Sequence, residues 1–430
     1  MRRATIFAAL LLTLLAFAWT APSASIRAGL EPFGQLRTGL VEGASLAQGG
    51  YALSWYTVDG GGATFSTGSS YTLGATIGQP DVGTLSGGSY TLAGGFWPGV
   101  ESPTPTGPTP LIVNTTDDSS DGACNAAHCS LREAINAANA RAGPDTIAFN
   151  IPGSDPGCDA SGVCTIQPAS LLPLLTDDGT TIDGYTQPGA SAGADPVLKI
   201  VLDGYDNGSF SGLAIRSADN VIRGLVIQRF TPFTAIDISG TAARDNRVEG
   251  NFIGTDVSGT QPRGNCTPPV SCAAVKIDLE AQGNTIGPDN LIAFNGQGVW
   301  VVDAGTWSNT ITRNRIHGNT GKGIWLYLGG NDELSPPMIT TASATWVLGT
   351  ACPNCTIEVF SDAEDEGAVY EGTTTADAAG NWTFTKPGGL TGPNVTATAT
   401  DENDNTSEFS APVSVGVTRL LYLPLVVKND

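Results

Sequence analysis

Short aliphatic runs recur at nearly constant spacing from Asn220 to Leu328, between turns that carry Asn and Gly. The runs are centred near Ile222, Ile236, Val248, Val275, Ile286, Val299, Ile311 and Ile324. The pattern predicts a coil of stacked strands that recur at intervals of about 12 to 13 residues. The step from Val248 to Val275 is about twice as long as the others. It predicts an insertion or a missed strand, with the extra chain between Gly254 and Cys272.

A full turn of this coil takes about 25 residues, which fits a parallel β-helix better than a leucine-rich or WD repeat. Successive turns begin alike, at Asn220, Asn246, Asn284 and Asn309. Asn and Gly tolerate left-handed backbone angles, so we expect these residues at the corners of the coil. Strand alternation points Val299 and Val301 inward and places Trp300 and Trp325 outward on successive turns. Each buried aliphatic side chain contributes roughly 1.5–3 kcal/mol, so the stacked interior supplies most of the stability.

The repeated Asn-x-Ile/Val turns resemble those of the right-handed β-helix family of pectate-lyase-like proteins. The resemblance is architectural and says little about activity. It implies that an enzyme of this kind would use acidic clusters with calcium and a basic residue, or paired aspartates. The recurring turns contain no Asn-Thr-Asp, Asp-Asp or Gly-His-Gly set; the Asp-Asp pairs, Asp117-Asp118 and Asp177-Asp178, both lie upstream.

A helix is predicted ahead of the coil. Ser130 and Glu133 form a capping box at its start, and its apolar face is made of Leu131, Ala134, Ile135 and Ala138. The run Cys129-Ser-Leu-Arg-Glu-Ala134 matches the motif that names the CSLREA domain, which in that family precedes right-handed β-helix repeats on exported bacterial proteins. We expect the helix to plug the open N-terminal end of the coil. A catalytic role for Arg132 and Glu133 is the alternative.

Other segments flank the predicted coil of residues 111–334. Residues 45–100 repeat a Tyr-x-Leu pattern from Tyr51, Tyr71 and Tyr90 with Gly-rich turns, which predicts a small antiparallel β module. Residues 101–110 form a Pro/Thr linker, stiff and extended. Residues 335–417 alternate as in an antiparallel sandwich and resemble bacterial immunoglobulin-like modules. Residues 418–430 form an apolar tail that suits either surface attachment or a last edge strand. The predicted fold is therefore all-β.

The composition limits the classes of binding partner that the protein can have. The 430 residues include 55 Gly and only 14% charged residues, and the net charge is −21. This balance disfavours nucleic acid and anionic membranes, because phosphate-binding surfaces need clustered Lys and Arg. It also disfavours anionic polysaccharides unless calcium bridges the carboxylates. A soluble, self-repelling extracellular protein, expected to be a monomer, fits the same composition.

Export is predicted from the N-terminus and the cysteines. Residues 1–24 combine Arg2 and Arg3 with a short apolar run and small residues, as a secretory signal peptide does, and no later segment approaches the length of a membrane span. Eight cysteines in an exported chain indicate an oxidising compartment. Their clustering favours local bridges that pair Cys124 with Cys129, Cys158 with Cys164, Cys266 with Cys272, and Cys352 with Cys355. Zinc or redox chemistry at Cys352 and Cys355 is the alternative to the last bridge.

Two functions remain open. The first is a non-catalytic secreted or cell-surface protein that binds an extracellular polysaccharide or cell-surface glycan through the side face of the coil. Its ligand-binding residues would be Lys276, Trp300, Trp325 and Tyr327, in an outward column that begins at Asp237. The second is a polysaccharide lyase or glycoside hydrolase on the same scaffold, with Asp237, Asp278 or Asp303 as acid and base.

No cofactor is required by either hypothesis, but an acidic run offers a calcium site. Its residues would be Asp362, Glu364, Asp365 and Asp401. A solvated hairpin loop is the alternative interpretation of this run.

Overall fold

The computed structural model describes residues 109–205, 210–266 and 272–416, together with the backbone of four strands between Thr64 and Gly94. The chain divides into two compact units, Met1–Ser102 and Pro103–Asp430. The predicted signal peptide of residues 1–24, the tail of residues 418–430 and most of the linker of residues 101–110 lie outside the described residues.

The first unit contains two antiparallel hairpins. One pairs β1 (Thr64–Gly68) with β2 (Tyr71–Ala75), and the other pairs β3 (Gly83–Gly87) with β4 (Tyr90–Gly94). The predicted antiparallel pairing is confirmed for these strands, because the repeats at Tyr71 and Tyr90 begin β2 and β4. Tyr51 lies outside the described residues.

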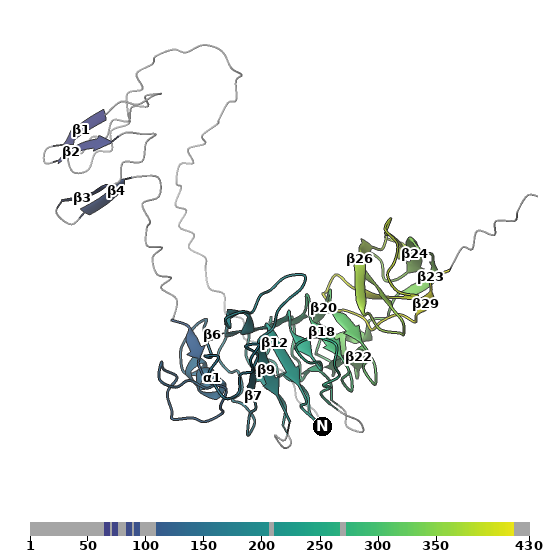
Figure 1. Cartoon of the computed structure of the whole chain (residues 1–430). Helices are drawn as coiled ribbons and strands as arrows, with labels where there is room; N and C mark the ends of the chain where they lie inside the picture. The colour runs from purple at the N-terminus through teal and green to yellow at the C-terminus, as the bar shows by residue number, and fades with distance from the viewer. Residues whose placement is uncertain are drawn as a thin grey trace, which may run out of the picture. The chain divides into compact units, whose positions relative to one another are not determined.

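The second unit begins with three parallel sheets that the chain visits in turn (Figure 1). Sheet 1 contains β10 (Leu213–Ile215), β13 (Ile236–Ser239), β16 (Val275–Asp278), β19 (Val299–Val302) and β22 (Ile324–Tyr327). Sheet 2 contains β5 (Leu111–Val113), β6 (Thr146–Phe149), β8 (Thr181–Asp183), β11 (Val221–Arg223), β14 (Arg247–Glu249), β17 (Thr285–Ile286) and β20 (Thr310–Ile311). Sheet 3 contains β7 (Cys164–Ile166), β9 (Ile200–Asp203), β12 (Leu225–Gln228), β15 (Phe252–Ile253), β18 (Leu291–Ala293) and β21 (Arg315–His317). We call this three-sheet arrangement the coil.

Within residues 220–328 every predicted strand centre lies in a strand of sheet 1 or sheet 2, but the strands of sheet 3 there, β12, β15, β18 and β21, were missed. The expected turn length is confirmed, because Val299 pairs with Val275 on the preceding turn and with Ile324 on the following turn, which is about 25 residues a turn. Each turn nevertheless holds three strands rather than two. The third strand follows the second so closely that their apolar positions merge in the sequence; only Gly224 separates β11 from β12.

The predicted insertion is also confirmed. Val275 pairs with Ile236, a separation much longer than one ordinary turn, and the extra chain leaves the coil after β15 and returns before β16. Inward aliphatic side chains from all three sheets form one buried cluster that runs from Leu111 to Leu326.

Buried asparagines form columns along the coil, and this corrects the role expected for them. In the first column the side-chain amide of Asn220 donates to Asn246 at 2.9 Å, and Asn246 donates to Asn284 at 2.9 Å. The column continues through Asn309 to Asn331. The left-handed angle belongs instead to the residue before the asparagine, as at Asp219 and Asp245. We call these columns asparagine ladders.

Two further ladders lie at the other corners. One contains Asn251, Asn290 and Asn314, and the other contains Asn265, Asn295 and Asn319. The amides of these two ladders bond to backbone carbonyls as well as to one another, and so satisfy polar groups that the corners bury.

The predicted helix is α1 (Leu131–Asn139), and its capping box is present between Ser130 and Glu133. Its expected apolar residues are buried and belong to the core cluster of the coil. The helix contacts β5 and β6 at the end of the coil where sheet 2 begins, which agrees with the expected plug. Arg132 pairs with Asp118 at 2.8 Å and donates to the carbonyls of Ser170 and Leu171, so its role here is to fasten loops.

All four predicted local disulfides are present, including the bridge between Cys352 and Cys355. The thiolates that a zinc ion at that pair would need are therefore bonded to each other. None of the helices in the described ranges has the length and apolar character that crossing a membrane requires.

Two antiparallel sheets follow the coil and share one core. The first contains β23 (Met338–Ala342), β24 (Trp346–Thr350) and β27 (Asn381–Thr385). The second contains β25 (Thr356–Asp362), β26 (Val369–Thr375), β28 (Asn394–Thr400) and β29 (Val413–Ser414). Val347, Ile357, Trp382 and Ala397 are buried between these sheets, which we call the sandwich.

Candidate functional site

The outward face of sheet 1 carries the predicted column. The register places Asp237 beside Lys276, Lys276 beside Trp300, and Trp300 beside Trp325. The alternation of buried Val299 and Val301 with these residues follows from the pleat of a strand. The column therefore lies where the sequence predicts it.

The two tryptophans stack on each other. Their ring centroids are 4.7 Å apart and their planes differ by 8°. The ammonium of Lys276 lies 5.5 Å from the centroid of the Trp300 ring, so both faces of that ring are covered and Trp300 is only 6% exposed. An open platform of two tryptophan faces is therefore not formed. The accessible aromatic groups are half-buried Trp325 and exposed Tyr327, whose centroids are 5.2 Å apart.

A pocket of about 530 Å³ lies beside Trp325, between the last turn of the coil and the sandwich. Trp325 is one of the residues that line this pocket, and its ring also stacks on Trp300. Its polar lining includes Gln297, Lys322, Asp365, Glu366 and Glu408, and Phe409 adds an apolar wall. We call it the junction pocket.

Glu408 crosses from the sandwich to the coil at this pocket. Its carboxylate pairs with the Lys322 ammonium at 2.5 Å and accepts the backbone N–H of Leu326 at 3.1 Å. Glu358 makes an equivalent contact elsewhere on the junction, where it accepts the backbone N–H of Arg313 at 2.8 Å. Carboxylates of the sandwich thus accept hydrogen bonds from backbone N–H groups of the last turn. These N–H groups need such acceptors because no further strand of the coil follows.

Glu366 ends the third asparagine ladder. Its carboxyl group accepts both the backbone and the side-chain N–H groups of Asn319 at 3.1 Å. Burial raises the pKa of Glu366 to about 7; the charges of Asp362 and Asp365 add to the shift, while the bonds from Asn319 oppose it. Burial also raises the pKa of Glu358. Near neutral pH the Glu366 carboxyl can therefore carry a proton in the pocket wall.

The three aspartates predicted as acid and base do not converge. Asp237 pairs with Arg216 at 2.5 Å, and Asp278 pairs with Lys276 on the next turn. In the β13–β16 register Asp278 pairs with Ser239, whereas Asp237 pairs with Lys276. Asp303 lies beyond the end of β19. Two of the three carboxylates are thus held in ion pairs along the side face, away from the junction pocket.

The four predicted calcium ligands are separated by the sandwich itself. Asp362 pairs with Asn394 in the β25–β28 register, whereas Asp401 follows Thr400, which pairs with Thr356. Several strand positions therefore lie between them, about 20 Å, far beyond the reach of one calcium ion. The carboxylate of Asp362 caps its own hairpin by accepting the N–H of Glu364 at 2.5 Å, and Glu364 and Asp365 are exposed.

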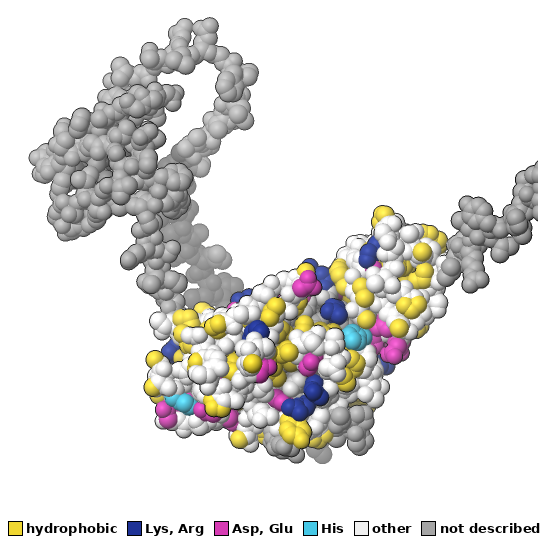
Figure 2. Space-filling model, viewed as in Figure 1, with side chains coloured by type: hydrophobic (Ala, Val, Ile, Leu, Met, Phe, Trp, Pro, Cys, Tyr) yellow, Lys and Arg dark blue, Asp and Glu magenta, His cyan; other side chains and the backbone are white. Residues whose placement is uncertain are grey.

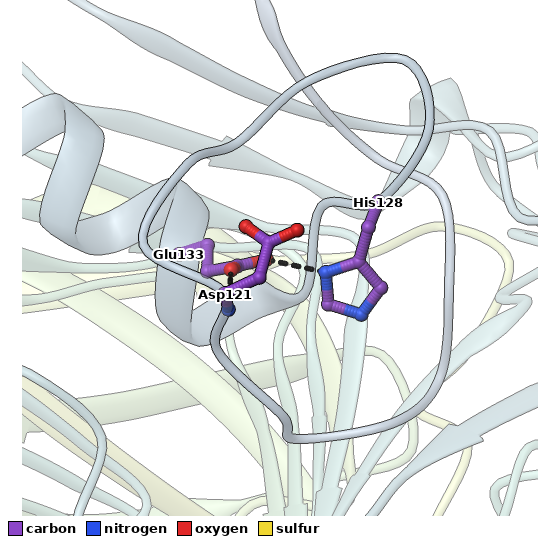
Figure 3. A group of neighbouring side chains, drawn as sticks. All are labelled: Asp121, His128 and Glu133. Atoms are coloured by element: carbon purple, nitrogen blue, oxygen red, sulfur yellow. Dashed lines mark hydrogen bonds and ion pairs between the residues drawn. The ribbon is translucent and has the colours of Figure 1, made fainter.

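A different group of metal-type ligands lies beside α1, where Asp121, His128 and Glu133 converge (Figure 3). One ligand atom from each lies within 4.8 Å of the others. Burial lowers the pKa of His128, but the hydrogen bond to Asp117 and the charge of Glu133 outweigh it, so the net pKa is raised. The sequence analysis did not predict this group; the position of His128 between Cys124 and Cys129, just ahead of the capping-box Glu133, was the signal that could have found it.

The surface is mixed in charge. Figure 2 shows acidic and basic side chains interspersed among uncharged ones on the viewed face of the coil, with acidic side chains gathered where it meets the sandwich. No model of a protein family matches the sequence, and no curated protein matches it either.

Proposed function

We propose that this protein binds carbohydrate non-catalytically, outside the cell, in the junction pocket. The observation that carries the proposal is a concave site of about 530 Å³ lined by a tryptophan together with hydrogen-bonding residues. Aromatic rings stack on the C–H faces of sugars, while amides, carboxyls and ammonium groups bond their hydroxyls. Trp325 supplies the ring, and Gln297, Lys322 and Glu408 supply the polar contacts.

The charges in the pocket favour a neutral glycan. Asp365 and Glu408 would repel the carboxylates of a uronate polymer, and the Lys322 ammonium is already paired with Glu408. The protonated Glu366 carboxyl would donate a hydrogen bond to a sugar oxygen. We therefore infer a neutral extracellular polysaccharide or cell-surface glycan as the ligand class.

The proposal also covers the fold of the two parts and the compartment in which the protein acts. Three parallel sheets joined in turn support a right-handed β-helix, since crossovers between parallel strands are right-handed in about 98% of cases. The two antiparallel sheets support an immunoglobulin-like module. Four disulfides fit the oxidising compartment to which the proposed signal peptide would deliver the chain.

The test is glycan binding by a Trp325→Ala variant. A panel of immobilised neutral, amino-sugar and uronate polysaccharides is screened with the wild-type protein, and dissociation constants are then measured for the glycans retained. We expect binding to neutral glycans and a loss of roughly tenfold or more in the variant, because a stacking contact worth about 1.4 kcal/mol corresponds to a factor of ten.

The matched control is Trp307→Ala, because Trp307 is 40% exposed and is not part of the pocket lining. Retention of only uronate polymers by the wild-type protein would contradict the charge argument. Equal affinity of wild-type protein and Trp325→Ala would remove the junction pocket as the site.

Hydrolysis is the second candidate, and the shifted pKa of Glu366 is the observation that favours it. A buried carboxyl that titrates near neutrality within a pocket, close to further carboxylates, is a combination found in glycosidases. This moves the acid and base from Asp237, Asp278 and Asp303 to Glu366 and Glu408. New reducing ends that form with wild-type protein and vanish with Glu366→Gln, while glycan affinity persists, would replace the binding proposal with this one.

A further inference from the structure

Three side chains from one loop and one helix turn point at a common centre beside the start of α1 (Figure 3). Glu133 belongs to the first turn of the helix, whereas Asp121 and His128 come from the loop that precedes it. The ligand atoms, one imidazole nitrogen and two carboxylate oxygens, all lie within 4.8 Å of one another. Ligands of a single metal ion are separated by distances of this order, since each lies about 2.0–2.2 Å from the ion.

Glu133 is held rigidly. Its side chain is 1% exposed, and its oxygens accept the backbone N–H groups of Ser130 at 3.0 Å, Asp121 at 2.6 Å and Gly122 at 3.2 Å. These contacts fix the carboxylate, and the Ser130 hydroxyl lies 3.4 Å from the same oxygen that faces His128. The same contacts bring the backbone of Asp121 to the helix, so the two carboxylates are preorganised together.

His128 is oriented as a metal-binding histidine would be. Its Nδ1 atom is buried and lies 2.8 Å from an oxygen of Glu133, yet makes no hydrogen bond of acceptable angle. Its Nε2 atom faces the carboxylate of Asp117 at 3.2 and 3.3 Å. Metal-bound histidines almost always direct the second ring nitrogen to a carboxylate or carbonyl, which fixes the ring orientation.

The loop is also closed covalently. The Cys124–Cys129 disulfide spans the segment that carries His128, and Asn114 bonds to the carbonyls of Asn125 and Ala126 inside it. A closed loop loses little further freedom when a ligand binds, so His128 needs no large rearrangement.

We propose that Asp121, His128 and Glu133 form a binding site for a divalent transition-metal ion, with zinc as the best fit. One imidazole and two carboxylates suit zinc, whereas calcium and magnesium take oxygen ligands. Binding displaces the proton from Nδ1 of His128 and leaves Nε2–H donating to Asp117. Exposed Asp121 leaves a fourth position open to water. The positive end of the helix dipole disfavours a cation here, but the carboxylates of Asp117, Asp121 and Glu133 outweigh it.

The test uses the full exported chain and does not depend on glycan binding. Zinc chloride is titrated calorimetrically into metal-free protein, with calcium chloride and magnesium chloride titrated in parallel, and cobalt(II) is added as a spectroscopic probe. We expect one zinc ion per chain, no saturable heat from calcium or magnesium, and visible cobalt absorption typical of low-coordinate N/O ligation.

Two variants locate the ion. His128→Gln and Asp121→Asn should each weaken zinc binding by at least tenfold and reduce the cobalt absorption. The matched control is His317→Gln, which alters the second histidine of the chain, on β21. Because Asp121 is exposed, its variant keeps the fold, and thermal unfolding checks this directly.

Three outcomes of these experiments would contradict the zinc site. The proposal is overturned if wild-type protein binds no zinc, or if His317→Gln weakens binding as much as His128→Gln does. It is equally overturned if Asp121→Asn and His128→Gln bind zinc as wild-type protein does, because the ion is then adventitious.

Discussion

The side chain of Asn246 makes four hydrogen bonds inside the coil. Its carbonyl oxygen accepts the backbone and side-chain N–H groups of Asn220, and its amide donates to Ser217 and Asn284. An alanine at this position would leave buried donors and acceptors without partners. We expect Asn246→Ala to lower the free energy of unfolding by about 3 kcal/mol.

Chemical denaturation measures this change. The control is Asn403→Ala at an exposed position, where we expect a change within about 0.5 kcal/mol. Similar free energies of unfolding for the two variants would contradict this prediction, because they would mean that water replaces the hydrogen bonds of the ladder at no cost in stability.

The ladder shows the limit of sequence reasoning at the residue scale. An asparagine before an Ile or Val run indicates a corner, and the corners are where the sequence places them. Whether the asparagine is exposed or buried depends on the asparagine one turn away, which is distant in the chain, as between Asn246 and Asn284. The local pattern therefore located these residues and misassigned the left-handed backbone angle.

At the scale of an element, α1 depends on its first turn. The Ser130 hydroxyl accepts the backbone N–H of Glu133 and donates to the carbonyl of Ser119 at 2.8 Å. We expect Ser130→Ala to lower the free energy of unfolding by roughly 1–2 kcal/mol, since it removes an N-cap and strands a buried carbonyl. Thermal and chemical unfolding report the loss.

Asn136→Ala is a control on the same helix, for which we expect a stability change of opposite sign. Asn136 is exposed, and alanine has the higher helix propensity, so Asn136→Ala should raise stability by a few tenths of a kcal/mol. A stabilising effect of Ser130→Ala would show that the helix is held by its apolar face alone.

Elements with local signals were predicted well. The capping box and the apolar face of α1 lie within one short segment, and the strands of sheets 1 and 2 have clear gaps between them. Sheet 3 has no such gap. Its strand β15 begins just after Gly250 and Asn251, so the corner is too short to appear as a break in the apolar pattern.

At the scale of the whole molecule, the contact between coil and sandwich depends on pH. The pKa of Glu366 is raised from 4.5 to about 7 in the folded protein. A raised pKa contributes stability that is fully present below pH 4.5 and is lost as the pH rises through 7. We expect the free energy of unfolding to fall by up to about 3 kcal/mol between pH 5 and pH 8. The pKa of Glu358 is raised as well, so its contribution has the same sign.

Unfolding of wild-type protein and Glu366→Gln at pH 5, 6.5 and 8 measures this dependence. The variant should show a flatter profile, and Glu364→Gln, at an exposed position on the same hairpin, should keep the wild-type profile. The carboxylates with lowered pKa, such as Asp117 at about 2, titrate below this window. The pKa of His128 is raised and that of His317 is lowered, and both histidines are common to the two proteins compared, so their contributions cancel in the comparison. An unchanged slope in Glu366→Gln would assign the dependence to other groups.

The junction pocket could not be predicted from the sequence. Its walls come from Gln297, from residues 321–325, and from residues 365–366 and 408–412, which meet only because the sandwich packs on the last turn. The separation of the proposed calcium ligands could not be predicted for the same reason. Asp362 and Asp401 each lie at the end of a strand in an acidic context, and only the antiparallel register shows that they occupy opposite ends of the sheet.

The asparagine ladders make successive turns of the coil interchangeable. Asn284 and Asn309 occupy equivalent corners, so removing the segment from Thr285 to Asn309 would join Asn284 to Thr310 with every strand still facing a parallel neighbour. The cap α1 would be untouched, whereas the sandwich end would lose Gln297 from the junction pocket and the bonds that Ser308 donates to Asn405 and Asn403. The length of the coil can thus change by whole turns, through duplication or deletion of a gene segment, while the chemistry of the end at α1 is retained.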